Sequence, residues 1–126
     1  MKKTVLITGC STGIGKATAL FFAARGWNVV ATMRTSTLDA NLGHKDSILI
    51  TRLNVQDRES IYQAINEGIA RFGKIDTLIS NAGFSLFGIF ESTPRGKVLE
   101  QFDVNVFGVM EVTRAILPHF KKKGVG

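Results

Sequence analysis

The chain has 126 residues, of which 44% are hydrophobic and 21% charged, a composition that suits one globular domain and excludes a disordered or collagen-like chain. Its formal net charge of +6 is compatible with a nucleic acid, an anionic membrane or a ligand with several phosphates, so charge alone does not choose among them. The single cysteine cannot form an internal disulfide, and no apolar run is long enough for a signal peptide or a membrane span, so we expect a cytoplasmic protein with no membrane partner.

The first half of the chain alternates short apolar runs with segments of helical period, which is typical of βαβ units around a parallel sheet. Residues 5–7 predict a first strand, and residues 13–25 a helix that Gly26 ends. We expect the apolar side of this helix to consist of Ile14, Ala17, Thr18, Phe21 and Phe22.

Two further strands are predicted over residues 27–32 and 47–53, with a polar, irregular segment between them. From Asp57 to Phe72 apolar residues recur at helical spacing. Asp57 is placed as the N-cap of this helix, and Gly73 ends it.

A fourth strand is predicted over residues 74–80, followed by a loop that opens with Asn81-Ala82-Gly83. The last helix is expected from about Pro94 or Lys97 to Leu117, with Pro118 and the lysines beyond it as the end. Its apolar stripe consists of Leu99, Phe102, Val106, Val109, Met110 and Leu117.

These elements predict an α/β, doubly wound parallel sheet of Rossmann-like type with the strand order 3-2-1-4. A ligand is expected at the carboxyl ends of the strands, where strands 1 and 4 diverge. The apolar strand 4 would be left as an edge, so we interpret residues 1–126 as one domain whose sheet is incomplete.

The loop after the first strand, Thr8 to Gly15, opens directly into a helix. Gly9 permits a tight turn, Gly13 a close approach to a pyrophosphate, and Gly15 close packing of the helix on the sheet. The helix N-terminus offers unpaired N–H groups to phosphates, and two hydroxyls, of Ser11 and Thr12, add donors. The alternative is an ordinary turn, which the strand before and the helix after disfavour.

Three features together resemble the short-chain dehydrogenases/reductases: the loop from Thr8 to Gly15, Asn81-Ala82-Gly83 after the fourth strand, and Asn105 on the following helix. The gap between the first two glycines also has that family's length. The resemblance covers essentially the whole chain. It implies hydride transfer between a nicotinamide cofactor and an alcohol or carbonyl substrate, and it implies that Gly9, Ser11, Thr12, Gly13, Ile14 and Gly15 bind the cofactor.

The end of the second strand bears on the choice between NADP and NAD. An acid there would bind the ribose 2′-hydroxyl of NAD, but the sequence has Met33 followed by Arg34, which could pair with a 2′-phosphate. Asp39 lies too far into the loop to take the place of that acid. The sequence therefore favours NADP over NAD, the alternative being that Arg34 is an ordinary solvated loop residue.

Other cofactor neighbours follow from the resemblance. Asn54 and Val55, after the third strand, are implied near the adenine, although the family commonly has an aspartate where Asn54 stands. Asn81, Ala82 and Gly83 are implied as further cofactor neighbours. A purely structural turn is the other interpretation of the last three, and the two are compatible.

Asn105 is implied as the asparagine of a catalytic Asn, Ser, Tyr and Lys group. From its position alone it would be a solvated residue in a helix that asparagine does not favour. The only tyrosine, Tyr62, has Asn66 four residues later, where the family has a lysine. We therefore expect that the chain stops before the catalytic serine and Tyr-x-x-x-Lys, and the alternative function is a non-catalytic nucleotide-binding fragment.

The remaining candidates are weaker. Cys10, near a helix N-terminus, is interpreted as a small filler, and neither His44 nor His119 has a catalytic partner. No residues have metal-ligand spacing, so no metal is expected. Nucleic-acid binding would rest on the lysines at 121–123 alone and is not expected. The apolar stripe of the helix that carries Asn105 is compatible with a homo-oligomer formed through this helix. The apolar residues between 84 and 90 suit either contact with a lipophilic substrate or packing under that helix.

Overall fold

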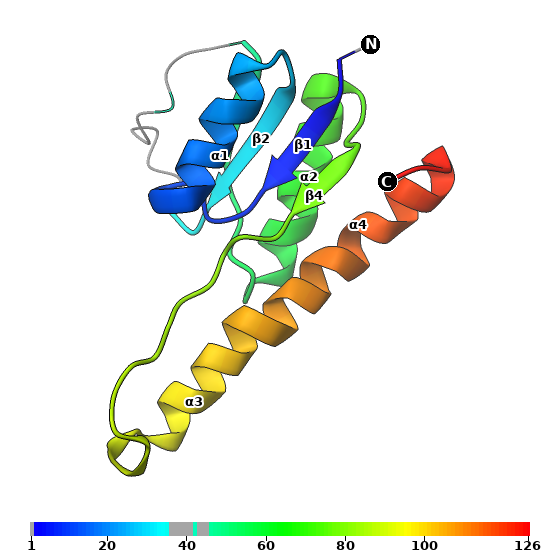
Figure 1. Ribbon diagram of the computed structural model, residues 1–126. Helices are drawn as coiled ribbons and strands as arrows, with labels where there is room; N and C mark the ends of the chain where they lie inside the picture. The colour runs from blue at the N-terminus through cyan, green and yellow to red at the C-terminus, as the bar shows by residue number, and fades with distance from the viewer. Residues whose placement is uncertain (1, 36–41, 43–45) are drawn as a thin grey trace.

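The computed structural model describes residues 2–35, 42 and 46–126. Its centre is a sheet of β1 (Thr4–Ile7), β2 (Asn28–Met33), β3 (Ile48–Arg52) and β4 (Thr77–Ile79), in the order β3-β2-β1-β4 (Figure 1). All the pairings are parallel. The predicted α/β doubly wound sheet and its strand order 3-2-1-4 are confirmed.

Helices cover both faces of this sheet (Figure 1). On one face α1 (Gly13–Ala24) packs with Ala19 against Val5, Ile7 and Val29. On the other face α2 (Arg58–Phe72) and α4 (Val109–Lys123) enclose a second cluster, which includes Leu6 and Val30. Alternate strand residues thus enter opposite clusters, which explains the unbroken apolar runs at residues 5–7 of β1 and 29–31 of β2.

The predicted apolar side of α1 was wrong for most of its residues, although Phe22 packs against the buried cluster on this face. The helix buries Gly15 and Ala19, whereas Ile14 and Phe21 are 78% and 51% exposed. Apolar residues occur almost all round this helix, so their spacing alone could not select a face. The close contact that only a glycine permits selects it, because Gly15 must lie against the loop after β1.

The predicted limits of α2 are confirmed. The carboxylate of Asp57 accepts a hydrogen bond from the Ser60 N–H, and Gly73 ends the helix with φ of 84°, in the left-handed region. The fourth strand is shorter than expected. Lys74 to Asp76 precede it, and the Asp76 carboxylate accepts a hydrogen bond of 2.8 Å from the Thr4 N–H.

The last helix differs most from its prediction. After a 3-10 turn, η1 (Phe90–Ser92), it consists of α3 (Arg95–Phe102), a π-helical segment η2 (Asp103–Gly108) and α4. Pro118 does not end α4, which continues to Lys123. Tertiary contacts hold this final turn, because His119 Nε2 accepts a 3.0 Å hydrogen bond from the Ile75 N–H, and Lys123 donates one of 3.1 Å to the Ile75 carbonyl.

The side of this long helix that faces the core was also predicted wrongly. The buried residues are Val104, Val112, Ala115 and Ile116. The predicted stripe is largely exposed, with Leu99, Phe102, Val106, Met110 and Leu117 each between 41% and 53% accessible. Small and β-branched residues meet α2 and the sheet, so the larger apolar side chains remain outside.

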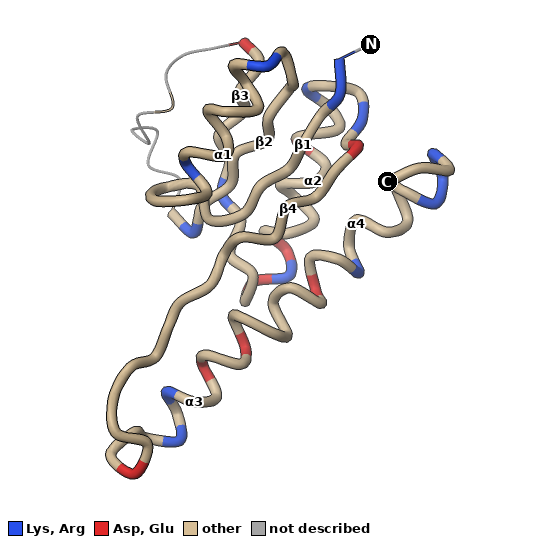
Figure 2. The backbone as a smooth tube through the Cα atoms, viewed as in Figure 1, with Lys and Arg blue, Asp and Glu red and all other residues tan. Residues whose placement is uncertain are grey.

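The charged residues are distributed unevenly over the fold (Figure 2). The last turn of α4 contains Lys121, Lys122 and Lys123, and Lys123 Nζ lies 2.8 Å from the Asp76 carboxylate at the start of β4. This basic cluster lies at the amino ends of the strands, and the predicted ligand site is at their carboxyl ends. Within residues 2–35, 42 and 46–126, no helix combines the length and apolar character that crossing a membrane requires.

Candidate cofactor site

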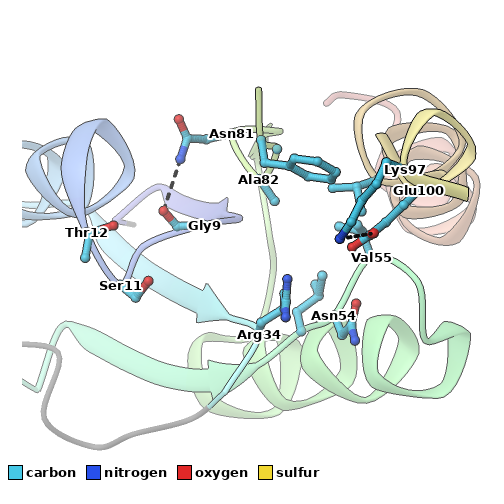
Figure 3. Close-up of a pocket in the computed structure, with 14 residues that line it drawn as sticks. Gly9, Ser11, Thr12, Arg34, Asn54, Val55, Asn81, Ala82, Lys97 and Glu100 are labelled. Carbon is cyan, nitrogen blue, oxygen red and sulfur yellow. Dashed lines mark hydrogen bonds and ion pairs between the residues drawn. The ribbon is translucent and has the colours of Figure 1, made fainter. Parts of the chain in front are cut away.

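A cleft of about 530 Å³ lies at the carboxyl ends of the strands (Figure 3). It draws residues from the loop after each strand and from the helix that follows β4. Nine residues predicted from the sequence line it: Gly9, Ser11, Thr12, Arg34, Asn54, Val55, Asn81, Ala82 and Gly83. The predicted ligand position thus coincides with a cleft that these residues form together.

Thr8 connects the loop after β1 to the loop after β4. Its Oγ1 accepts hydrogen bonds of 2.9 Å from the N–H groups of both Asn81 and Ala82. Its own N–H donates to the Ile79 carbonyl at 3.1 Å. A buried hydroxyl therefore fixes the glycine loop and Asn81-Ala82-Gly83 relative to each other, although more than 70 residues separate them in sequence.

The Gly9 carbonyl is the point where α1 meets this junction. The Asn81 Nδ2 donates to it at 3.1 Å, and a Cβ placed on Gly15 would lie only 2.0 Å from it. Gly9 itself has φ of 73°, and a Cβ there would lie 3.0 Å from the Ala82 Cα. Both positions therefore require glycine, one for close approach and the other also for its conformation.

The first turn of α1 is available to an anion. Thr12 is its N-cap but makes no side-chain capping hydrogen bond, and the first turn of this helix holds no acidic residue. Figure 3 shows Ser11 and Thr12 beside the cleft, on the side of the glycine loop. Helix N-termini of this kind attract phosphate through free N–H groups and the positive end of the helix dipole.

Not every predicted cofactor residue lines the cleft. Gly13 has φ of 62° at the helix start, and Ile14 is 78% exposed beside it. Gly15 is buried against Gly9. The place of Gly15 indicates support of the loop, and the N–H groups of the first turn are the groups that a ligand would meet.

Cys10 is fully buried behind the loop, where its thiol donates a 3.3 Å hydrogen bond to the Ile7 carbonyl. Burial raises the pKa of this thiol to about 11, although a hydrogen bond with the Thr32 backbone acts in the opposite direction. Such a thiol is a poor nucleophile. Its environment agrees with the role of a small filler.

Arg34 follows the last residue of β2 and lines the cleft. Figure 3 shows its side chain on the floor of the cleft, next to Asn54. Asp39 and His44, which the sequence argument considered, lie outside the described residues. Arg34 is thus positioned at the carboxyl end of the second strand, as the argument for NADP requires.

The segment after β3 is held by the start of α2. The Asn54 N–H donates to Ser60 Oγ at 2.9 Å, and Asn54 Oδ1 accepts from the Gln56 N–H at 3.0 Å. The side-chain oxygen of Asn54 is therefore used within the turn, and its amide NH₂ remains for a ligand. Val55 is 7% exposed and presents an apolar surface to the cleft.

Asn105 lies inside η2 and does not line the cleft. Its Oδ1 accepts from the Phe84 N–H at 3.0 Å, and its Nδ2 donates to the Phe84 carbonyl at 2.7 Å. One side chain thus satisfies both backbone groups of Phe84, which compensates for an asparagine within a helix. The structure places Asn105 as a support for the loop after β4, and its catalytic role stays a prediction.

Phe84 belongs to the apolar segment that the sequence assigned either to a substrate or to packing, and four further lining residues were not predicted: Leu53, Lys97, Glu100 and Val104. Lys97 Nζ lies 3.6 Å from the Glu100 carboxylate, on the side of the cleft opposite the glycine loop (Figure 3). The spacing of Lys97, Glu100 and Val104 places them on one face of the helix, and this spacing can be read from the sequence. Only the path of the helix across the cleft shows that this face meets the site.

The other candidate groups lie elsewhere. Tyr62 is 44% exposed on α2, and His119 bonds the Ile75 backbone. Among the residues that the structure describes, no three His, Cys, Asp or Glu side chains gather in a way that could hold a metal ion. The chemistry of the site therefore centres on the glycine loop, the end of β2 and the helix that crosses the cleft.

The family model described as short chain dehydrogenase matches residues 3–126. The uncharacterized oxidoreductase YusZ of Bacillus subtilis is 37% identical over 130 aligned positions, which cover 98% of this chain and 46% of YusZ.

Two solved structures also match nearly the whole of this chain. The 3-ketoacyl-(acyl-carrier-protein) reductase from Brucella melitensis, complexed with NADH, superposes with a TM-score of 0.91 at 30% identity, over 97% of this chain and 52% of the reductase. ElxO with NADP bound gives a TM-score of 0.90 at 32% identity, over 100% of this chain and 53% of ElxO. The chain thus spans about half the length of the proteins that it matches.

Proposed function

Because the chain belongs to the short-chain dehydrogenase family, we propose that it is the nucleotide-binding part of an NADP-preferring oxidoreductase, which transfers hydride between the cofactor and an alcohol or carbonyl substrate. The observation that carries this proposal is the position of Arg34 at the end of β2, facing the same cleft as the glycine loop. The related structures include one with NADH and one with NADP, so family membership leaves the choice of cofactor open.

The cleft suits a dinucleotide. Gly9 and Gly83 bring backbone without a side chain to its lining, and Gly15, which is buried against Gly9, lets α1 approach the loop closely. The uncapped start of α1 supplies donors for a pyrophosphate. An apolar surface for an adenine is available on the buried Val55 and Val104.

In this assignment each group has one task. The N–H groups at the start of α1, with Ser11 and Thr12, hold the pyrophosphate, and Val55 and Val104 contact the adenine. Arg34 pairs with the 2′-phosphate through charge-assisted hydrogen bonds. When bound, NADP would supply or accept the hydride. The serine, tyrosine and lysine that the family uses for proton transfer would belong to sequence beyond Gly126.

Binding constants for NADPH and NADH test the cofactor preference. We expect Arg34→Ala to weaken NADPH binding by about tenfold to a hundredfold, since each lost charge-assisted hydrogen bond costs roughly 1.5–3 kcal/mol, and to leave NADH binding within about twofold. Arg25→Ala is the matched control, because Arg25 lies over Phe21 at the far end of α1. Tighter binding of NADH than of NADPH by the unaltered protein would overturn the preference.

A second candidate, which the sequence also left open, is a nucleotide-binding protein without catalysis. Turnover distinguishes the two. Oxidation of NADPH by carbonyl compounds, followed at the absorbance of the reduced nicotinamide, is expected from an oxidoreductase, whereas binding without oxidation would support the alternative.

We further propose a lipophilic substrate and a cytoplasmic location. Phe87, Ile89 and Phe90, in the segment after Asn81-Ala82-Gly83, are between 67% and 90% exposed, so they do not pack under the last helix. We propose that these exposed side chains contact an apolar substrate. The basic cluster of α4 lies at the other end of the sheet, which argues against nucleic acid as a ligand of this cleft.

A further inference from the structure

The π-helical segment η2 contacts both walls of the cleft. On one wall Asn105 bonds both backbone groups of Phe84. On the other wall the Gln56 Nε2 donates a 2.7 Å hydrogen bond to the Asp103 carboxylate. Between these contacts Val104 is 7% exposed and lines the cleft itself. The position of η2 therefore affects the separation of the two walls.

The tightest of these contacts is between Gly108 and Val55. A Cβ at position 108 would lie 2.5 Å from Val55 Cγ2 and 2.7 Å from Val55 Cβ. Real Cβ atoms essentially never approach another heavy atom so closely. Any side chain at position 108 therefore requires either Val55 or η2 to move.

Val55 has little freedom to yield by itself. Its Cβ is fixed by the backbone, and a β-branched side chain has few allowed rotamers. The residue before it is tied to Ser60 by a hydrogen bond of 2.9 Å, and the residue after it to Asp103. A change at position 108 would thus displace the whole segment from Asn54 to Gln56.

The spacing within η2 relates this contact to the ligand. Val104 and Gly108 are four residues apart and so lie on the same side of the helix, which is the side that Val55 meets. Val104 and Val55 both line the cleft, and Gly108 is buried next to Val55. Gly108 thus affects the cleft through Val55, without lining the cleft itself.

We propose that Gly108 is a positioning residue for the adenine end of the cofactor cleft: by carrying no side chain it lets η2 close on Val55, and so holds Val55 and Val104 at the separation that an adenine ring needs. This inference rests on the proposed function, since it takes the ligand to be an adenine dinucleotide. The inference adds to that function a residue, Gly108, that does not line the cleft. It also predicts that a change at this residue affects only the binding of the adenosine half of the cofactor.

The test compares Gly108→Ala with Gly96→Ala in the full-length protein. Gly96 is a matched control because it is also helical, in α3, and a Cβ there would meet no atom within 4 Å. The probes are ADP-ribose, which contains the adenosine and pyrophosphate, and reduced nicotinamide mononucleotide, which lacks adenosine. Gly108→Ala is expected to weaken ADP-ribose binding by about tenfold or more and to leave mononucleotide binding within about twofold. Gly96→Ala is expected to change neither.

A double variant addresses the possibility that Gly108→Ala folds poorly. Val55→Gly removes both Val55 atoms, Cβ and Cγ2, that the new methyl group would meet. In this background Gly108→Ala should reduce ADP-ribose affinity much less than it does in the unaltered protein, so the two substitutions would be non-additive. An equal loss in both backgrounds, an equal loss for both probes, or unchanged ADP-ribose affinity would overturn the proposal.

The outcomes also separate this inference from the proposed function. If the unaltered protein binds neither ADP-ribose nor NADPH, the proposed function fails before any variant is compared. If it binds both and Gly108→Ala binds them equally well, the proposed function stands and the role of Gly108 fails.

Discussion

In the loop after β1, contacts with the Gly9 carbonyl oxygen explain the roles of Asn81 and Gly15. The Gly9 carbonyl accepts from the Asn81 side chain and leaves no space for a Cβ on Gly15. The sequence argument identified these residues through the family motif, with Gly9 for the turn and Gly15 for packing. The structure adds the specific partner of each, and it adds Thr8 as the hydroxyl that connects the loops after β1 and β4.

Cys10 gives a prediction at the same scale. Because burial raises the pKa of its thiol from 9.0 to about 11, the reactive thiolate at pH 8 should be roughly a hundredfold scarcer than in an exposed cysteine. We expect negligible labelling of the folded protein by a chromogenic disulfide reagent and one equivalent of labelling in denaturant. Rapid labelling of the folded protein would show that the loop after β1 opens readily.

Among the elements, the end of α4 depends most on tertiary contacts. The Asp76 carboxylate accepts from Lys123 at 2.8 Å, from the Thr4 N–H at 2.8 Å and from Lys74 at 3.1 Å. These bonds connect the end of α4, the start of β1 and the start of β4. They explain why the helix continues past Pro118, where the loss of one backbone donor would otherwise favour an end.

The hydrogen bonds to the Asp76 carboxylate predict how the stability of the fold depends on pH. Burial alone would raise the pKa of Asp76, but the hydrogen bonds from Lys123, Thr4 and Lys74 outweigh it and lower the pKa from 3.8 to about 2. A depressed folded-state pKa means that the carboxylate stabilises the fold fully above about pH 4 and loses this contribution as the pH falls to about 2. Urea unfolding midpoints measured from pH 5 to pH 2 should therefore decrease over this window.

Asp76→Asn isolates this contribution. The variant is expected to lose roughly 1.5–3 kcal/mol of unfolding free energy at pH 7, because hydrogen bonds to a charged acceptor are lost, and to show a weaker pH dependence between pH 4 and pH 2. Glu91→Gln, at an exposed carboxyl group in η1, is the control and should leave both quantities unchanged. An unaltered pH slope in Asp76→Asn would assign the acid sensitivity to other carboxylates.

At the scale of the whole molecule, two apolar surfaces remain accessible. The sheet order leaves β4 at one edge, and the outer side of the long helix exposes Leu99, Phe102, Val106, Met110 and Leu117. Contiguous apolar surface of this kind marks interaction sites in soluble proteins. We propose that the helix surface is covered by a second copy of the chain, an arrangement with which the sequence is compatible.

Light scattering on the full-length protein tests this association. Met110→Glu would place a charge on the covered surface, so the measured mass should decrease toward that of the monomer. Tyr62→Glu is the matched control, since Tyr62 is 44% exposed on α2 and Met110 is 49% exposed. A monomeric unaltered protein would contradict the proposal.

Sequence alone determined the four strands and their order, the first two helices, and nine of the residues that line the cleft. The elements follow from apolar runs, helical spacing and glycine positions, which are local signals, and the strand order follows because right-handed crossovers leave few arrangements of parallel strands. Asn54, Val55 and Asn81-Ala82-Gly83 were implied by the resemblance to the short-chain dehydrogenases. The limits of α2 were equally accessible, since a capping aspartate and a terminal glycine act within one helical turn.

Only the tertiary structure decided which sides of α1 and of the last helix are buried, how far α4 extends, and that Lys97, Glu100 and Val104 reach the cleft. Both helices have apolar residues on more than one side, so their spacing is ambiguous. The choice is made by contacts between residues distant in sequence, such as Gly15 with Gly9 and Asn81, Gly108 with Val55, and Lys123 with Asp76. These contacts depend on how closely two backbones approach, which appears only when the elements are packed together.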